Sequence, residues 1–289
     1  MLSRFIPEPL LSLLSAANHR RKSDRIGCAR GEHGKSCLLV MNGPSLNESA
    51  NVLKARDSDR VFAVNYFAES DFFETVRPDF YVFQDSHFWR DDVLESFKQA
   101  RERTFEALNR KTDWPLTVYF PSACARREWA KERFANPNIQ VRYWNSGFLR
   151  RRRSDIGYLG ESRTLFGLWS REWASPPRDN VLIACLYLAE RLGFEQIEFV
   201  GGDFSFFLEM MVDPETNRVG RRIEHFYGTE ISPIYKGNTG QVPTTMAHEM
   251  LRWHRSFRAL EVIKAYLERR QVRVVNRSAE SFIDCFERG

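Results

Sequence analysis

Short apolar runs alternate with helical patterns from position 37 to the end of the chain. The apolar runs are typical of buried strands and cover residues 37–41, 60–64, 79–83, 116–120, 196–200 and 272–275. Helical spacing covers residues 180–192 and 246–270, and the pattern up to residue 56 predicts a further helix after the first strand. This alternation predicts an α/β fold, a single Rossmann-like, mostly parallel sheet with helices on both faces.

Two long connections lack a clean period. Residues 142–177 are rich in Arg, Trp, Ser and Gly, and residues 203–242 are interrupted by four glycines. Long connections of this kind in a compact domain usually form lids or binding loops. The second one follows the carboxyl end of a predicted strand, where open parallel sheets bind ligands, so we expect a lid at about 203–242.

Residues 1–36 form an N-terminal extension ahead of the α/β pattern, which runs over residues 37–286. Apolar residues within 1–17 precede the basic cluster 19–22, and Pro7 and Pro9 argue against a secretory signal. We expect either a helix that packs on the domain or an amphipathic segment on an anionic membrane face. No run reaches the roughly 18 to 20 apolar residues that a membrane-spanning helix needs.

Composition restricts the class of protein. The 289 residues are 43% hydrophobic and 28% charged, which excludes a disordered or collagen-like chain. The net charge of +5 suits a phosphorylated substrate, an anionic membrane or nucleic acid, but no nucleic-acid-binding module is recognisable. The 5 cysteines form no C-x-x-C pair and no cluster with histidine, which predicts reduced thiols in a cytosolic protein without structural zinc.

Two glycine-containing turns invite comparison with phosphate-binding loops. Residues 29–36 (ARGEHGKS) nearly satisfy Walker A spacing, but they precede a predicted strand instead of following it, so we reject a nucleoside triphosphatase. The turn Asn42-Gly43-Pro44-Ser45 does follow a strand, and its free N–H groups would bind a phosphate while Asn42 binds a sugar or base. Its single glycine excludes a dinucleotide site. The alternative is a turn that needs Gly and Pro only for its conformation.

Polar residues also follow other predicted strands: Asn65, Asp85, Asp203 and Asn276. The carboxyl ends of parallel strands meet at one edge of a sheet, so together these side chains predict a polar crevice. Each of them, taken alone, is also explained as a turn cap.

Five segments, in order, resemble a known family. They are residues 40–46 (VMNGPSL), 64–67 (VNYF), 80–89 (FYVFQDSHFW), 180–205 and 272–284. The set resembles bacterial family 42 sialyltransferases. It resembles more closely the domain shared by motility-associated (Maf-type) flagellar glycosyltransferases and hydroxymethylpterin-pyrophosphokinase-like proteins.

The resemblance implies a GT-A variant fold with a lid. It implies inverting, metal-independent transfer of a nonulosonic acid, such as sialic acid, from a CMP-sugar to a bacterial surface glycan, a glycolipid or flagellin. No cofactor is expected. A homo-oligomer is also implied, located in the cytoplasm either free or at the inner face of the cytoplasmic membrane.

The resemblance assigns donor-binding positions as well. Asn42, Gly43 and Ser45 match the phosphate and nucleotide turn, and Asn65 matches an asparagine that contacts the donor. Asp85 falls near the donor sugar, where the sialyltransferases have asparagine. Asn276 and Ser278 fall in the segment that holds the cytidine and ribose, and Asp179 and Asn180 occupy the start of the helix that meets the donor carboxylate. Asp203, which follows the strand at 196–200, completes the expected donor-binding residues.

The leaving phosphate needs a further group. The sialyltransferases hold it with a tyrosine where this chain has Ser205, so Tyr227 or Tyr235 of the lid are expected to replace that tyrosine. Arg178 would add a positive charge beside the donor carboxylate.

Inverting transfer also needs a base for the acceptor hydroxyl, and histidine suits that role because its pKa lies near neutrality. The family base lies at the end of the lid, which favours His248. His254 is the second candidate, on another face of the same helix, and His225 is the third.

Two other functions stay open. Asp85, Asp203 and His225 would suit Mg²⁺, which an ATP-dependent pterin pyrophosphokinase requires. Ser205 in place of the tyrosine is instead compatible with a non-catalytic nucleotide-binding protein of glycan assembly.

Overall fold

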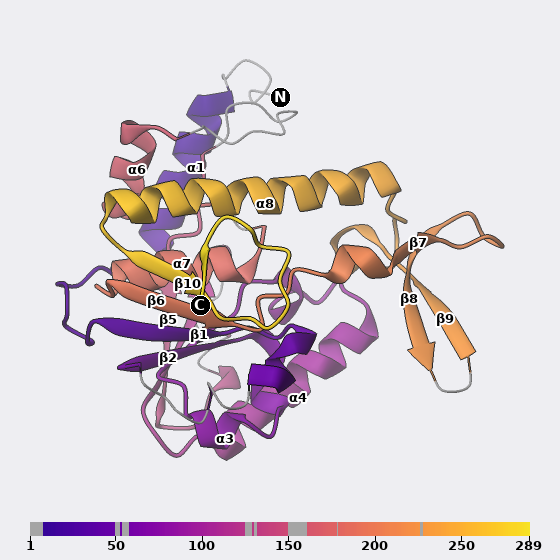
Figure 1. Ribbon diagram of the computed structural model, residues 1–289, viewed down its shortest axis with the longest axis horizontal. Coiled ribbons are helices and arrows are strands. Elements are labelled where there is room, and N and C mark those ends of the chain that lie inside the picture. Colours follow the sequence, from indigo (N-terminus) through magenta and orange to yellow (C-terminus); the bar gives the residue numbers. More distant parts are fainter. Residues whose placement is uncertain are drawn as a thin grey trace.

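The computed structural model describes residues 8–49, 53, 58–124, 129, 132–149, 161–177, 179–225 and 228–289. Within these residues, eight strands form one parallel sheet in the order β11-β10-β6-β1-β2-β3-β4-β5 (Figure 1). The strands are β1 (Ser36–Val40), β2 (Arg60–Val64), β3 (Phe80–Val82), β4 (Leu116–Pro121), β5 (Ile139–Trp144), β6 (Gln196–Val200), β10 (Arg273–Asn276) and β11 (Glu287–Arg288). The predicted Rossmann-like α/β fold is therefore confirmed.

Helices cover both faces of this sheet, and Figure 1 shows α1, α6, α7 and α8 above it and α3 and α4 below it. Their bounds are α1 (Glu8–Lys22), α3 (Phe73–Val76), α4 (Glu95–Lys111), α6 (Arg163–Ser170), α7 (Val181–Arg191) and α8 (Met246–Arg269). Successive side chains of a strand point to opposite faces. Accordingly, Cys37 and Leu39 of β1 belong to the core under α6, α7 and α8, whereas Leu38 and Val40 belong to the core against α4.

The chain reverses its direction across the sheet between β1 and β6. From β1 the strands proceed outward through β2, β3, β4 and β5, and the chain then returns to place β6 on the other side of β1. In an open parallel sheet, such a switch point separates the loops that leave the two central strands and creates a crevice at their carboxyl ends. The fold therefore places the most favourable ligand site next to the ends of β1 and β6.

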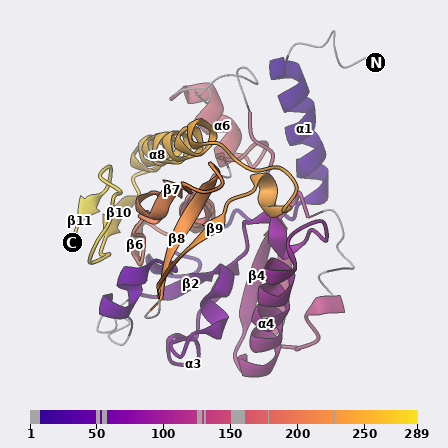
Figure 2. The same cartoon turned by 90° about the vertical axis from the view of Figure 1, so that its right-hand side faces the viewer.

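The region expected to be an irregular lid contains a small sheet. Strands β7 (Met210–Val212), β8 (Val219–His225) and β9 (Gly228–Pro233) pair antiparallel, flanked by the short 3₁₀ helices η5 (Phe206–Glu209) and η6 (Lys236–Asn238). Figures 1 and 2 show this sheet beyond the carboxyl edge of the large one, beside the first turns of α8. The prediction of an irregular segment was wrong because Gly220 and Gly228 are themselves paired residues of β8 and β9.

Other element predictions were also incomplete. The helix expected up to residue 56 begins instead as the 3₁₀ helix η2 (Pro44–Ser49), and most of residues 50–57 lie outside the described part of the chain. Strand β5 and helix α6 fall partly or wholly within residues 142–177, which were expected to be irregular. Only the last two residues of β5 are buried, whereas α6 buries Leu165, Phe166 and Trp169, so each element has its own short pattern within a long connection.

The N-terminal extension includes α1, which packs on the domain. Ala16 is 2% exposed within the core under α7, and the Nδ1 atom of His19 lies 3.0 Å from the Oγ atom of Ser122. Leu13 and Leu14 face outward and are exposed. Among the described residues, no helix is both long and apolar enough to cross a membrane.

Candidate functional site

The predicted polar residues lie along one edge of the sheet. Asn276 ends β10, and Asn42, Asn65 and Asp85 come within three residues of the ends of β1, β2 and β3. Asp203 follows β6 by the same interval. These five strands are neighbours and run parallel, so their carboxyl ends form one continuous edge, as the sequence predicts.

The junction of β1 and β6 is held by a carboxylate. Asp203 is 5% exposed and accepts a hydrogen bond of 2.7 Å from the backbone N–H of Ser45, and the Ser45 hydroxyl donates to its other oxygen. The backbone N–H of Gly43 donates to the carbonyl oxygen of Gly201 at 2.8 Å. A Cβ atom at position 43 would lie 2.5 Å from both the Asp203 Cγ and the Gly201 carbonyl oxygen, so only glycine fits there.

This junction differs from the phosphate turn that the sequence predicts. Its N–H groups are not free, because those of Gly43 and Ser45 are bound as described and that of Leu46 donates to the Gly43 carbonyl at 3.0 Å. The turn leads into the six-residue 3₁₀ helix η2, too short to supply the dipole of a regular helix. Asn42 is exposed, and its Nδ2 donates to the Val64 carbonyl at 3.0 Å, which joins the ends of β1 and β2.

The ends of β6 and β10 are joined by a second set of hydrogen bonds. Ser278 Oγ accepts from the Gly202 N–H at 2.8 Å, and the Ser278 N–H donates to Asn276 Oδ1 at 3.0 Å. Asn276 is fully buried, and its Nδ2 has no hydrogen-bond partner in the described part of the chain. The Asn276 amide is therefore a buried donor for which the described residues supply no acceptor.

A similar arrangement lies at the ends of β2 and β3. Asn65 Nδ2 donates to the exposed Asp85 carboxylate at 3.1 Å, and the Tyr81 hydroxyl donates to the Asn65 carbonyl at 2.6 Å. Asn65 has a φ of 46°, a left-handed conformation that asparagine tolerates better than most residues. Its Oδ1 is buried and, within the described residues, is without a hydrogen-bond partner.

Sequence reasoning missed a buried pair beside Asn65. The Tyr66 hydroxyl and His87 Nε2 lie 2.7 Å apart, and His87 is 5% exposed. Burial lowers the pKa of His87 below 6.5, Asp85 opposes this shift and Arg101 adds to it. Burial raises the pKa of Tyr66, so the pair is a neutral imidazole and a phenol at neutral pH. Position was the available signal, since both residues come just after a strand.

The residues predicted for the donor carboxylate lie at the start of α7. Asn180 is its N-cap, because its Oδ1 accepts from the Leu182 N–H at 2.7 Å. Asp179 is exposed, and its carbonyl accepts a 3.5 Å hydrogen bond from Ser256 of α8. A helix N-terminus carries partial positive charge, which suits an anion. The predicted Arg178 lies outside the described residues.

The predicted bases lie on α8. His248 is half-buried in its first turn, where its N–H donates to the N-cap Thr245 hydroxyl at 3.2 Å, and His254 is exposed. His248 precedes Ser256 by two turns, or about 12 Å of helix, and α8 extends past the sheet edge toward β7 (Figure 1).

The remaining lid candidates are only partly described. Ser205 is half-buried, and its carbonyl accepts from the Leu208 N–H at 2.9 Å. Tyr235 precedes η6 and bridges to Pro243. Tyr227 lies outside the described residues, and so does the side chain of His225, on which the alternative Mg²⁺ group depends.

One sequence prediction about cysteine is wrong. Cys28 does cluster with a histidine, since Cys28, Glu32 and His33 place three ligand atoms within 4.8 Å of one another. The three residues lie just before β1, at the opposite edge of the sheet from the polar residues. The chain turns back on itself in this loop, and the sequence separation of the three residues does not predict that turn.

Comparisons with known proteins give limited similarity. No protein-family model matches the chain, and no curated protein matches it. It is similar to the Maf glycosyltransferase from Magnetospirillum magneticum AMB-1, with 15% identity, a TM-score of 0.48 and coverage of 98% of this chain and 38% of that one. It is also similar to an Aureusimine biosynthetic cluster reductase domain, with 11% identity, a TM-score of 0.22 and coverage of 94% and 56%. The chain thus spans less than two thirds of either protein.

Proposed function

We propose that this protein is a glycosyltransferase that binds a CMP-sugar along the carboxyl edge of its sheet. The observation that carries the proposal is the alignment of Asn276, Asp203, Asn42, Asn65 and Asp85 at the ends of five adjacent parallel strands. The ordered sequence motifs that resemble Maf-type glycosyltransferases and family 42 sialyltransferases support the same function.

Asn276 and Asn65, which flank the junction of β1 and β6, supply a hydrogen-bond donor and an acceptor of the kind that a nucleotide binds. The buried Nδ2 of Asn276 is a donor for an oxygen of the cytosine or ribose, and the buried Oδ1 of Asn65 is an acceptor for a hydroxyl or amino group. The junction made by Gly43, Ser45 and Asp203 fixes the distance between these two flanks. The leaving phosphate would lie between them, near the start of α7 and its partial positive charge.

The chemistry requires a base and groups that stabilise the departing CMP. In this proposal His248 removes the proton of the acceptor hydroxyl as that oxygen attacks the anomeric carbon of the sugar, and the bond to the phosphate oxygen breaks with inversion. Polar groups at the edge stabilise the negative charge on the phosphate. No metal ion is assigned a part in this transfer.

The sugar is proposed to be a nonulosonic acid, and the acceptor a bacterial surface glycan, a glycolipid or flagellin. A glycolipid acceptor would bring the protein to the inner face of the cytoplasmic membrane. The exposed Leu13 and Leu14 of α1, beside the basic residues 19–22, are the part of the chain suited to that contact.

Nucleotide binding tests the proposal first. Thermal unfolding would be measured with CMP, CDP, UDP, GDP and ATP, each with Mg²⁺ and with a chelator. We expect CMP to raise the unfolding temperature equally in both conditions. Stabilisation only by ATP with Mg²⁺ would replace the proposal with a pyrophosphokinase, which needs that ion to bridge phosphates.

Turnover tests the catalytic part. Release of CMP from CMP-sialic acid would be followed for the wild type, for His248→Ala and for His254→Ala, an exposed histidine on the same helix. We expect His248→Ala to lower turnover at least about 100-fold with unchanged CMP binding, and His254→Ala to stay near the wild type. Nucleotide binding without any turnover would identify a non-catalytic nucleotide-binding protein.

A further inference from the structure

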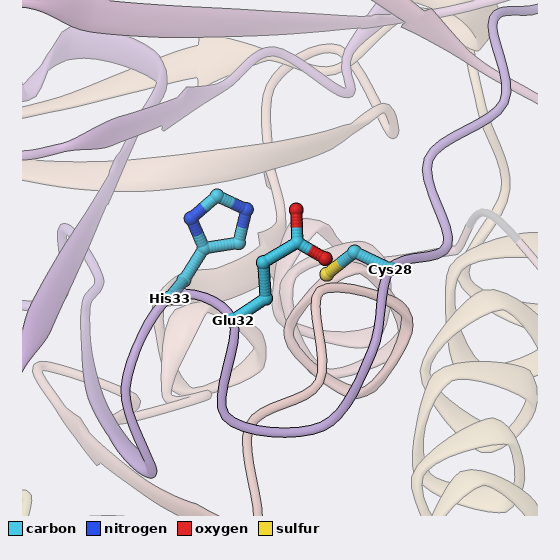
Figure 3. A group of neighbouring side chains, drawn as sticks. All are labelled: Cys28, Glu32 and His33. Atoms are coloured by element: carbon cyan, nitrogen blue, oxygen red, sulfur yellow. The ribbon is translucent and has the colours of Figure 1, made fainter.

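A short loop before β1 brings three metal-ligand side chains together. Figure 3 shows the Glu32 carboxylate between the Cys28 sulfur and the His33 ring. One ligand atom from each residue lies within 4.8 Å of the other two. Cys28 and His33 are half-buried and Glu32 is exposed, so the group is open to solvent on one side.

The loop is fixed on both sides of this group. The buried Glu172 carboxylate accepts from the N–H of Ile26 at 3.0 Å and from that of Gly27 at 2.5 Å. Gly31 has a φ of 75° and Gly34 a φ of 101°, values that glycine adopts without strain, and they turn the chain back on itself. The backbone that carries the three side chains is therefore held in place without an ion.

The carboxyl end of α7 faces the same group. The N–H of Cys28 donates to the Arg191 carbonyl at 3.1 Å, and its thiol lies 2.9 Å from the Leu192 carbonyl oxygen. A helix carboxyl end carries partial negative charge and favours a cation. The Arg191 guanidinium lies 3.5 Å from Glu190 and 3.6 Å from Glu172, so those carboxylates offset its positive charge.

We propose that Cys28, Glu32 and His33 bind a divalent transition-metal ion, with Zn²⁺ as the preferred occupant. A thiolate, an imidazole and a carboxylate are the ligand types that zinc takes, and water would fill the fourth position. Zinc–ligand bonds of about 2.0 to 2.3 Å place ligand atoms about 3.3 to 3.8 Å apart in a tetrahedral site. The three ligand atoms, all within 4.8 Å of one another, would reach these separations by rotation of the side chains, of which Glu32 is the exposed one. Binding replaces the thiol proton, which passes to solvent, with a sulfur–metal bond.

All three ligands come from residues 28–33, so the ion would close the loop before β1 on itself. The His33 ring already lies 5.7 Å from that of Phe80 at the start of β3 and 6.5 Å from that of Phe194 before β6. The site lies at the amino edge of the sheet, so it is separate from the proposed nucleotide edge. Metal binding at this site does not depend on the proposed transfer.

Cobalt titration tests the site directly. The metal-free, reduced full-length protein would be titrated with Co²⁺ and examined for thiolate-to-cobalt absorption, after which Zn²⁺ would be added to displace it. The variants are Cys28→Ser, which keeps a hydrogen-bond donor, and Glu32→Gln, which keeps an acceptor for the Ala29 N–H that donates to Glu32 at 3.1 Å. Cys285→Ser removes another half-buried thiol and is the matched control.

We expect one Co²⁺ per chain with a thiolate band that zinc abolishes. Cys28→Ser should remove the band and weaken zinc binding more than about 100-fold, Glu32→Gln should weaken it about tenfold, and Cys285→Ser should leave both unchanged. Zinc should raise the unfolding temperature of the wild type but not of Cys28→Ser. Circular dichroism of the metal-free variants confirms that they fold. The proposal is overturned if the wild type shows no thiolate band, or if folded Cys28→Ser retains it.

Discussion

Polar side chains are paired at the junction of β1 and β6, whereas polar atoms at the ends of β2 and β10, the two flanks of this junction, lack partners in the part of the chain that the structure describes. At the junction, both oxygens of Asp203 accept hydrogen bonds from Ser45, and the Gly43 N–H donates to the Gly201 carbonyl. At the flanks, Asn65 Oδ1 and Asn276 Nδ2 are buried atoms for which the described residues supply no hydrogen-bond partner.

This difference separates structural polar groups from groups available to a ligand. An unsatisfied buried polar atom costs about 1 to 3 kcal/mol, which a bound nucleotide recovers when it supplies the missing partner. At the junction the carboxylate and the turn N–H groups already have partners, so a ligand would recover no such free energy there. We therefore expect substitutions at the junction to lower the free energy of unfolding, and substitutions at the flanks to lower ligand affinity.

Removing the central carboxylate should have the largest effect. Asp203→Ala takes away the two hydrogen bonds that Ser45 donates to the carboxylate in a buried site, so we expect the free energy of unfolding to fall by about 3 to 4 kcal/mol. Urea unfolding measures this loss. Asp284→Ala removes an exposed carboxylate from the segment that packs beside Asp203 and should change stability by less than about 0.5 kcal/mol. Equal losses in the two variants would contradict a structural role for Asp203.

Adding one methyl group at the turn should be the next largest effect. In Gly43→Ala the new Cβ meets the Asp203 carboxyl and the Gly201 carbonyl oxygen at 2.5 Å, and we expect a loss of about 2 to 3 kcal/mol. Gly167→Ala is the matched control, because its Cβ approaches only the flexible Arg171 side chain, at 3.4 Å, on helix α6. That variant should be neutral or slightly stabilised. A stable Gly43→Ala protein would show that the junction is looser than described.

The buried histidine at one flank predicts a pH dependence. Because burial lowers the His87 pKa below 6.5 in the folded state, the unfolded chain takes up a proton first as the pH falls. The contribution of His87 to the free energy of unfolding should therefore be fully present above about pH 6.5. Below that pH the free energy of unfolding should decrease, by at most about 1.4 kcal/mol per pH unit. Subtracting the same curve for His87→Gln isolates this contribution. A difference curve that is flat between pH 5 and 6.5 would contradict the prediction.

Substitution of a flanking asparagine should affect stability least and binding most. Asn65→Gly keeps the left-handed backbone and removes the side-chain amide, so the free energy of unfolding should change by less than about 0.5 kcal/mol. Affinity for CMP, measured by calorimetry, should fall about tenfold, the equivalent of one hydrogen bond. Unchanged affinity in this variant would remove Asn65 from the proposed site.

Strand positions were readily predicted from the sequence, because strands buried on both faces are nearly continuous apolar runs, as in β1 and β2, where only the first residue is not buried. Strand β5 was missed because only its last residues, Tyr143 and Trp144, are buried, and the pattern of the rest is mixed. The edge could be predicted since parallel strands must end together. The hydrogen-bond partners at this edge could not be predicted, because they are distant in sequence: Ser45 and Asp203 are 158 positions apart.

A crystal structure of the protein with CMP, grown in the presence of a chelator, would show whether the nucleotide lies along the carboxyl edge of the sheet. We expect electron density for the nucleotide along the ends of β10, β6, β1 and β2, with polar contacts to Asn276 Nδ2 and Asn65 Oδ1 and with the Asp203–Ser45 hydrogen bonds intact. Density for CMP elsewhere on the protein, or an empty edge at saturating nucleotide, would contradict it.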